Sequence, residues 1–121
     1  MGKRPASGEE VAGLETLLSL NGEVFCWSGY WVKFEAWRVD PDEHVPHGIR
    51  YSLTLHDADN RRLVGYDNAH AVQGRKKRYE PKRVVWDHRH LYDRVEPYKF
   101  SDAVTLLEDF WADVESVVSG E

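Results

Sequence analysis

The sequence is poor in cysteine and has no long apolar run. Its 121 residues include a single cysteine, Cys26, so an intrachain disulfide and a cysteine-rich zinc site are both excluded. No apolar stretch approaches the ~20 residues of a membrane-spanning helix, and residues 1–5 lack the apolar stretch of a signal peptide. We therefore expect a cytoplasmic protein that does not associate with membranes.

Motifs of several large enzyme and binding classes are also absent. The chain has no Gly-rich phosphate loop, no Gly-x-Ser-x-Gly elbow, no His-Glu-x-x-His motif and no helix-turn-helix signature. It does contain material for one hydrophobic core, because 41% of its residues are hydrophobic and 12% are aromatic. At this length we expect residues 1–121 to form a single domain, with a flexible start at residues 1–7.

Charge is distributed unevenly along the chain. The formal net charge is −5, yet residues 61–94 carry ten Lys and Arg against four Asp and Glu, a local charge of +6. Residues 101–121 carry six acidic residues and no basic ones. A ligand meets the local field, so the overall acidity does not exclude a polyanionic partner. The two segments could equally neutralise each other within the fold or across a homodimer.

Two helices are predicted, one near each end of the chain. Ser7 and Glu10 have the spacing of a capping box, and the apolar residues that follow at helical spacing predict a helix over residues 8–20. Ser101 can cap a second helix over residues 101–118. The apolar stripe of this second helix consists of Val104, Leu107, Phe110, Trp111, Val114 and Val118. Its simplest interpretation is packing on a sheet.

The middle of the chain, residues 30–100, predicts an antiparallel sheet of four to five strands. Apolar and polar residues alternate over residues 49–56, which is typical of a strand with one solvent-exposed face. Two later strands are expected at residues 62–67 and 84–90, joined by a basic loop at residues 68–82. The fold class is thus α+β: an N-terminal helix, the sheet, and a C-terminal helix packed on it. A loop of this length in a compact domain is more often functional or mobile than incidental.

The densest group of reactive side chains is Asp87, His88, Arg89 and His90. In a strand over residues 84–90, the two histidines would extend the row that faces the core, and Asp87 and Arg89 would point to the other face. Two imidazoles ~7 Å apart suit general acid–base catalysis. Arg89 could hold a phosphate by a bidentate contact. The alternative is that the histidines are hydrogen-bonded packing residues at a strand end.

A basic segment lies between the last two predicted strands. Its cations and aromatic ring combine phosphate neutralisation with a stacking surface, which suits single-stranded nucleic acid. The residues concerned are Arg75, Lys76, Lys77, Arg78, Tyr79, Lys82 and Arg83. The alternative is an ordinary solvated loop. Supporting residues are expected at Tyr66, Asp67, Asn68, His70 and Tyr98.

Metal binding is the less favoured use of the histidines. A His-x-His pair supplies two ligands, and nothing in the spacing requires Asp67, His70 or Asp87 to supply a third. We therefore predict no metal and no cofactor.

Several short motifs of this sequence occur together in a known family. Arg50–Leu53, Gly65–His70, Asp87–His90 and Glu96–Phe100, followed by an acidic helix, resemble the TumE-like toxins of prokaryotic toxin–antitoxin systems. The resemblance covers roughly residues 30–118. Many members have a more compact stretch that ends in paired histidines, whereas here the stretch is longer and basic and ends in His-Arg-His. The resemblance implies a growth-inhibiting toxin encoded beside a helix-turn-helix antitoxin, with RNA as the expected target.

Three functional hypotheses follow. In a metal-independent endoribonuclease, one of His88 and His90 would take the proton from a ribose 2′-hydroxyl and the other would protonate the leaving 5′-oxygen. Arg89 or residues 75–78 would stabilise the pentacovalent phosphate. In a non-catalytic module, residues 75–83 would grip nucleic acid or a protein. In the third, the acidic helix would occupy a basic groove of a partner, with Trp111 as its anchor.

Overall fold

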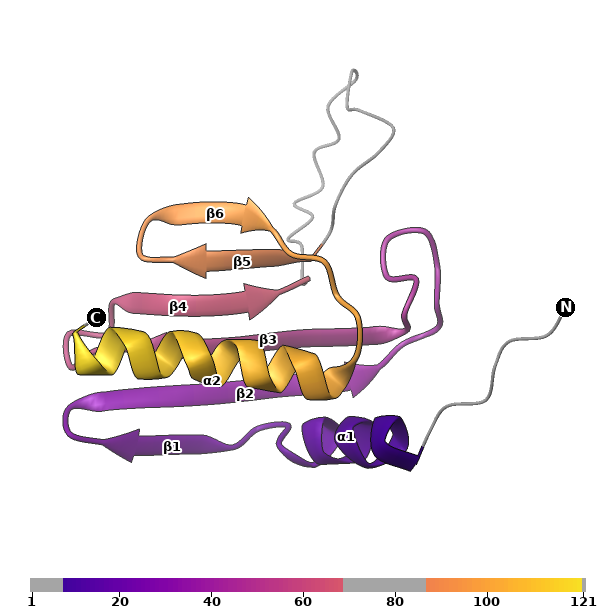
Figure 1. Cartoon of the computed structure of the whole chain (residues 1–121), viewed down its shortest axis with the longest axis horizontal. Coiled ribbons are helices and arrows are strands. Elements are labelled where there is room, and N and C mark those ends of the chain that lie inside the picture. The colour runs from indigo at the N-terminus through magenta and orange to yellow at the C-terminus, as the bar shows by residue number, and fades with distance from the viewer. Residues whose placement is uncertain (1–7, 69–86, 121) are drawn as a thin grey trace, which may run out of the picture.

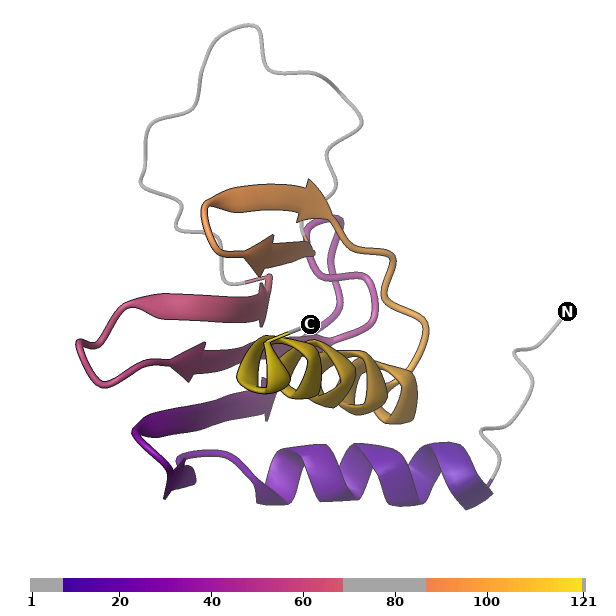
Figure 2. The ribbon, with the colours of Figure 1, turned by 60° about the vertical axis from the view of Figure 1, so that its left-hand side comes forward.

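A computed structural model describes residues 8–68 and 87–120, which form two helices and one antiparallel sheet (Figures 1 and 2). In chain order the elements are α1 (Gly8–Ser19), β1 (Val24–Trp27), β2 (Tyr30–Arg38), β3 (Ile49–His56), β4 (Arg62–Asp67), β5 (His88–Leu91), β6 (Arg94–Pro97) and α2 (Ala103–Ser119). The α+β class is confirmed, with six described strands rather than four to five. The predicted flexible start, Ser7 and almost all of the predicted basic loop lie outside the described residues.

The six strands form a simple meander in the order β1-β2-β3-β4-β5-β6, each antiparallel to the next. The two outer hairpins account for the underestimated strand count. The edge strands β1 and β6 have only four residues each, too few for a clear alternation. Two-residue turns at Ser28–Gly29 and Tyr92–Asp93 join them to β2 and β5. Ser28, Gly29 and Tyr92 have positive φ, as the tight turns of hairpins require. Neither turn carries the Asn-Gly or Asp-Gly signal that would have predicted it.

Helix α2 packs on one face of the sheet and forms the core with it (Figure 1). Leu106, Phe110 and Val114, at helical spacing, are buried against the inward rows of β2 to β4, and the rings of Phe110 and Phe34 meet edge to face at 5.6 Å. Each large apolar side chain that is fully buried in this way stabilises the fold by about 1.5–3 kcal/mol. The inward residues of the sheet are Val32, Phe34, Ala36, Ile49, Tyr51, Leu53, Leu55, Val64 and Tyr66.

The ends of α2 differ slightly from the prediction. The N-cap is Asp102 rather than Ser101, because the Asp102 carboxylate accepts the backbone N–H of Thr105 at 2.8 Å. Gly120, with φ of 82°, closes the other end. The predicted packing of α2 on the sheet is confirmed. However, its buried row is centred on Leu106, Phe110 and Val114, and Trp111 remains 39% exposed.

Helix α1 lies beside α2, at the β1–β2 end of the sheet (Figures 1 and 2). Gly13 permits this close approach, since a Cβ atom at that position would collide with the side chain of Val104. Leu17 is fully buried in the shared core. Within the part of the chain that the structure describes, no helix lies on the opposite face of the sheet.

We call this opposite face the open sheet face. Its side chains alternate with those of the core and are mostly half-buried. On β2 to β5 they are Trp31, Lys33, Glu35, Trp37, Arg50, Ser52, Thr54, His56, Arg62, Asp67, His88 and His90.

Candidate functional site

The two faces of the sheet separate the predicted catalytic residues. Strand β5 pairs with β4 in the register His88–Asp67, Arg89–Tyr66 and His90–Gly65. The Tyr66 hydroxyl donates to Asp113 of α2, at 2.6 Å, so Arg89 opposite it also faces the helix. His88 and His90 therefore lie on the open sheet face.

The prediction that the histidines extend the core-facing row is thus wrong. The row that continues the core is the one that contains Tyr66 and Arg89. The expected strand over residues 84–90 is also corrected, since β5 begins at His88 and Asp87 precedes it. Residues 84–86 lie outside the described residues.

The His88 and His90 rings lie side by side on the open sheet face, with centroids 6.5 Å apart. His90 Nε2 is 3.1 Å from Asp67 Oδ2, and its Nδ1 is 3.0 Å from Arg62 Nη2. A guanidinium can only donate, so Nδ1 must accept and the ring proton must reside on Nε2. Burial and the nearby Arg62 charge lower the pKa of His90, although Asp67 opposes the shift. His90 is consequently a neutral imidazole at pH 7.

Gly65 makes the contact between Arg62 and His90 possible. A Cβ atom at Gly65 would lie 3.1 Å from Arg62 Cδ and 3.5 Å from His90 Cβ. The Arg62 side chain therefore passes directly over Gly65 of its own strand to reach the imidazole on β5. Residue 65 is in this way part of the site; the sequence had marked it only as the first residue of the Gly65–His70 motif and gave it no role.

The rest of the open sheet face carries aromatic rings, hydroxyl side chains and charges of both signs. Trp31 and His56 stack with centroids 4.0 Å apart and an interplanar angle of 10°, and Trp37 is 45% exposed. Lys33 forms an exposed ion pair with Glu35 at 3.6 Å. Flat rings next to cations can stack bases and neutralise phosphates.

Arg89 is held by carboxylates on the helix face. Its Nε and Nη2 donate to the two oxygens of Asp113 at 2.8 and 2.9 Å, and its Nη1 donates to Glu96 at 2.6 Å. These bonds, led by the one to Asp113, raise the pKa of Arg89. Two carboxylates balance the charge of Arg89. Its hydrogen bonds to Asp113 therefore connect β5 to α2, and the residue is poorly placed to bind a phosphate.

Asp87 belongs to a separate polar cluster. It accepts the Tyr51 hydroxyl at 2.7 Å and His47 Nε2 at 2.9 Å, and burial together with Asp87 raises the pKa of Tyr51. The Ile49 backbone N–H donates to His47 Nδ1 at 3.3 Å, which fixes the His47 tautomer, and the His47 ring stacks on Phe100 at 4.0 Å. Sequence reasoning missed His47, because forty residues separate it from Asp87 and no spacing rule connects them.

The predicted supporting residues that are described have structural partners. Asn68 is buried, where its side chain accepts the Tyr51 N–H at 3.0 Å and donates to the Ile49 carbonyl at 2.8 Å. Tyr98 donates to Asp109 at 2.7 Å. Eight predicted residues lie outside the described residues: His70, Arg75, Lys76, Lys77, Arg78, Tyr79, Lys82 and Arg83.

Fold and site together define a small α+β domain. One face of its sheet is polar and carries His88 and His90, and neither of the described helices covers this face. A family model described as Toxin TumE matches residues 10–118, most of the chain. The protein belongs to the TumE toxin family. Membership in a toxin family implies an antitoxin partner in general terms. Neither the comparison with curated proteins nor the comparison with solved structures gave a match.

The described residues contain neither a membrane-spanning helix nor a metal-binding cluster. None of the described helices is both long enough and apolar enough to cross a bilayer. Within residues 8–68 and 87–120, no group of three or more His, Cys, Asp and Glu side chains is arranged to hold a metal ion.

Proposed function

We propose that this toxin cleaves RNA without a metal, as an endoribonuclease whose catalytic pair is His88 and His90. The observation that carries the proposal is the geometry of the pair: two imidazoles 6.5 Å apart on the open sheet face, one of them bracketed by Asp67 and Arg62. A site of action on RNA implies that the protein works in the cytoplasm. Its antitoxin is expected to be a helix-turn-helix protein.

In the proposed reaction His90 is the general base. Its lowered pKa keeps the imidazole neutral, and Asp67 on Nε2 would stabilise the imidazolium that forms. Nδ1 is available once Arg62 transfers its hydrogen bond to the substrate phosphate. Nδ1 then takes the 2′-hydroxyl proton as the 2′-oxygen attacks phosphorus. His88 donates the proton that the departing 5′-oxygen takes up, and the products are a 5′-hydroxyl and a 2′,3′-cyclic phosphate.

The open sheet face offers a binding surface for the flanking nucleotides. Trp37 and the Trp31–His56 stack provide flat rings for bases, and Lys33 provides a positive charge. The basic residues 75–83 belong to the segment that joins β4 to β5, the two strands that carry the Asp67–His90 contact. We propose that they bind the RNA backbone.

The test combines a growth assay with an RNA gel. Wild type, His88→Ala/His90→Ala and the control His44→Ala, which changes a half-exposed loop histidine, are expressed in a host without the antitoxin. We expect the double variant to lose toxicity and the control to keep it. Purified wild type should cut RNA equally with and without EDTA and leave cyclic phosphate ends. Equal toxicity of wild type and the folded double variant would refute the catalytic role of the pair.

One observation favours a second candidate, a module that binds nucleic acid without cutting it. Both ring nitrogens of His90 are engaged, so neither can exchange a proton until a partner leaves. Such a module would bind RNA with steep salt dependence, because phosphate contacts release counterions, and would yield no product on the same gel.

A further inference from the structure

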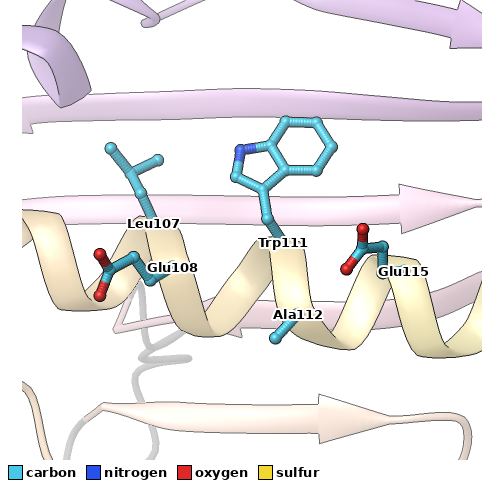
Figure 3. Close-up of a pocket in the computed structure, with 5 residues that line it drawn as sticks. All are labelled: Leu107, Glu108, Trp111, Ala112 and Glu115. Atoms are coloured by element: carbon cyan, nitrogen blue, oxygen red, sulfur yellow. The ribbon is translucent and has the colours of Figure 1, made fainter.

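A second surface of the protein lies on the side of the sheet opposite to His88 and His90. It is an open groove that runs along the middle turns of α2 and extends from Trp111 over strand β1. One part, about 560 Å³, is lined by Leu107, Glu108, Trp111, Ala112 and Glu115 (Figure 3). The adjoining part, about 400 Å³, is lined by Leu20, Phe25, Trp27, Phe34 and Trp111. Because Trp111 lines both parts, we call the whole the Trp111 groove.

The groove is not needed to complete the core. Helix α2 already buries Leu106, Phe110 and Val114 against the sheet, whereas Trp111, one position further round the helix, keeps 39% of its surface exposed. Helix α1 covers only the first part of α2, near Val104. The Trp111 indole lies against Trp27, with ring centroids 6.4 Å apart.

The strand that borders the groove is itself an edge. Among the described strands, β1 is the first of the sheet and pairs with β2 alone. Phe25 of this strand is 43% exposed. Exposed aromatic side chains in a contiguous hollow are characteristic of protein-binding surfaces, in which Trp is enriched among the residues that contribute most.

Charge selects the kind of partner. Glu108 and Glu115 project from α2 on either side of Trp111 along the helix (Figure 3), and both are exposed. The other two acids of this stretch are already engaged, Asp109 with Tyr98 and Asp113 with Arg89. Helix α2 has no basic residue to offset Glu108 and Glu115. The occupant should therefore carry large apolar side chains flanked by Lys or Arg.

A second copy of this chain meets that requirement poorly. Two copies related by a twofold axis through the groove would bring Glu108 and Glu115 of one protomer against the same acids of the other. Like charges placed across an interface in this way oppose association.

We infer that the Trp111 groove is the docking site of the antitoxin, for an amphipathic segment with apolar anchors flanked by basic residues. The inference rests on the toxin role proposed above, since a toxin of such a pair must be bound by its antitoxin. The segment would be held on the face of the sheet opposite to His88 and His90. Neutralisation and RNA cleavage would therefore depend on different residues of the toxin.

The experiment uses the full chain and the purified product of the adjacent open reading frame. Glu108→Lys/Glu115→Lys reverses both groove charges without touching the core. Glu15→Lys/Glu43→Lys makes the same charge change at two exposed acids outside the groove lining. We expect the groove variant to bind the neighbouring protein about tenfold to hundredfold more weakly than wild type, because attraction becomes repulsion. The control should bind like wild type.

Growth assays separate the possible failures. Without antitoxin the groove variant should be as toxic as wild type, and co-expressed antitoxin should rescue wild type but not the variant. Absence of toxicity in wild type would refute the proposed function itself. Two results with a toxic wild type would overturn the docking site. In one, the neighbouring protein does not bind wild type; in the other, it binds wild type and the groove variant equally tightly. A wild-type homodimer that the groove variant abolishes would also overturn it, because a second copy would then be the occupant.

Discussion

Replacing Arg89 by Ala tests whether this residue holds the fold together or acts on the substrate. In the folded chain its guanidinium binds both oxygens of Asp113 and one of Glu96. The Asp113 side chain is only 17% exposed, so without Arg89 it would keep the Tyr66 hydroxyl as its remaining side-chain partner. Removing one member of a fully buried ion pair costs about 3–5 kcal/mol. Because this pair keeps some contact with water, we expect Arg89→Ala to lower the free energy of unfolding by about 2–3 kcal/mol.

Urea and thermal unfolding measure the effect. For a domain of this size each kcal/mol corresponds to about 4 °C, so the Tm should fall by about 8–12 °C. Glu96→Gln is the matched control at the other end of the guanidinium. The Glu96 side chain is 51% exposed, and its loss should cost about 1 kcal/mol or less. In a double-mutant cycle, Arg89→Ala and Asp113→Ala should cost together clearly less than the sum of their separate costs.

Toxicity of the same variant completes the test. Below its Tm, Arg89→Ala should still inhibit growth, because the charge of Arg89 is already balanced by two carboxylates. An Arg89→Ala protein that is as stable as wild type but not toxic would refute this reasoning. Such a result would support the phosphate-binding role that the sequence suggested for Arg89.

Three further predictions concern the environment of the site. Arg62→Gln should raise the pKa of His90 and Asp67→Asn should lower it, since Arg62 opposes and Asp67 favours the charged ring; NMR titration of the imidazole would show shifts of opposite sign. The pKa of His90 is lower in the folded chain than the ~6.5 of an unfolded one, so the unfolded state binds its proton first as the pH falls. Stability should therefore be complete above pH ~6.5 and decrease below it, and His90→Gln should remove this part of the dependence in urea unfolding at several pH values. Asn68→Ala leaves a buried N–H of Tyr51 and a buried carbonyl without partners, and should cost about 2–4 kcal/mol by the same measurement; a loss below 1 kcal/mol would contradict this account.

Local pattern was sufficient for most of the architecture. The alternation over residues 49–56 became β3 with every second side chain buried, and the apolar spacing of residues 8–20 became α1. The apolar stripe of the last helix does pack on the sheet. These predictions succeeded because the period of apolar residues reports directly which side of an element is hidden from water. The edge strands β1 and β6 were missed, since four residues carry too little periodicity.

Proximity in sequence was a poor guide to the composition of the site. Asp87, His88, Arg89 and His90 are consecutive, yet they contribute to three different environments: the His47–Tyr51 cluster, the open sheet face and the ion pair with α2. Asp67 and Arg62, the actual partners of His90, come from the neighbouring strand.

By itself, the sequence determined the α+β class, the positions of both helices and the presence of a histidine pair on a strand. These are local properties, set by periodicity and by alternation along one chain segment. Only the tertiary structure decided on which face of the sheet the histidines lie and which charged residues contact them. It also decided that carboxylates balance the charge of Arg89. They depend on the register between β4 and β5 and on where α2 packs, and a shift of one residue in that register would exchange the two faces.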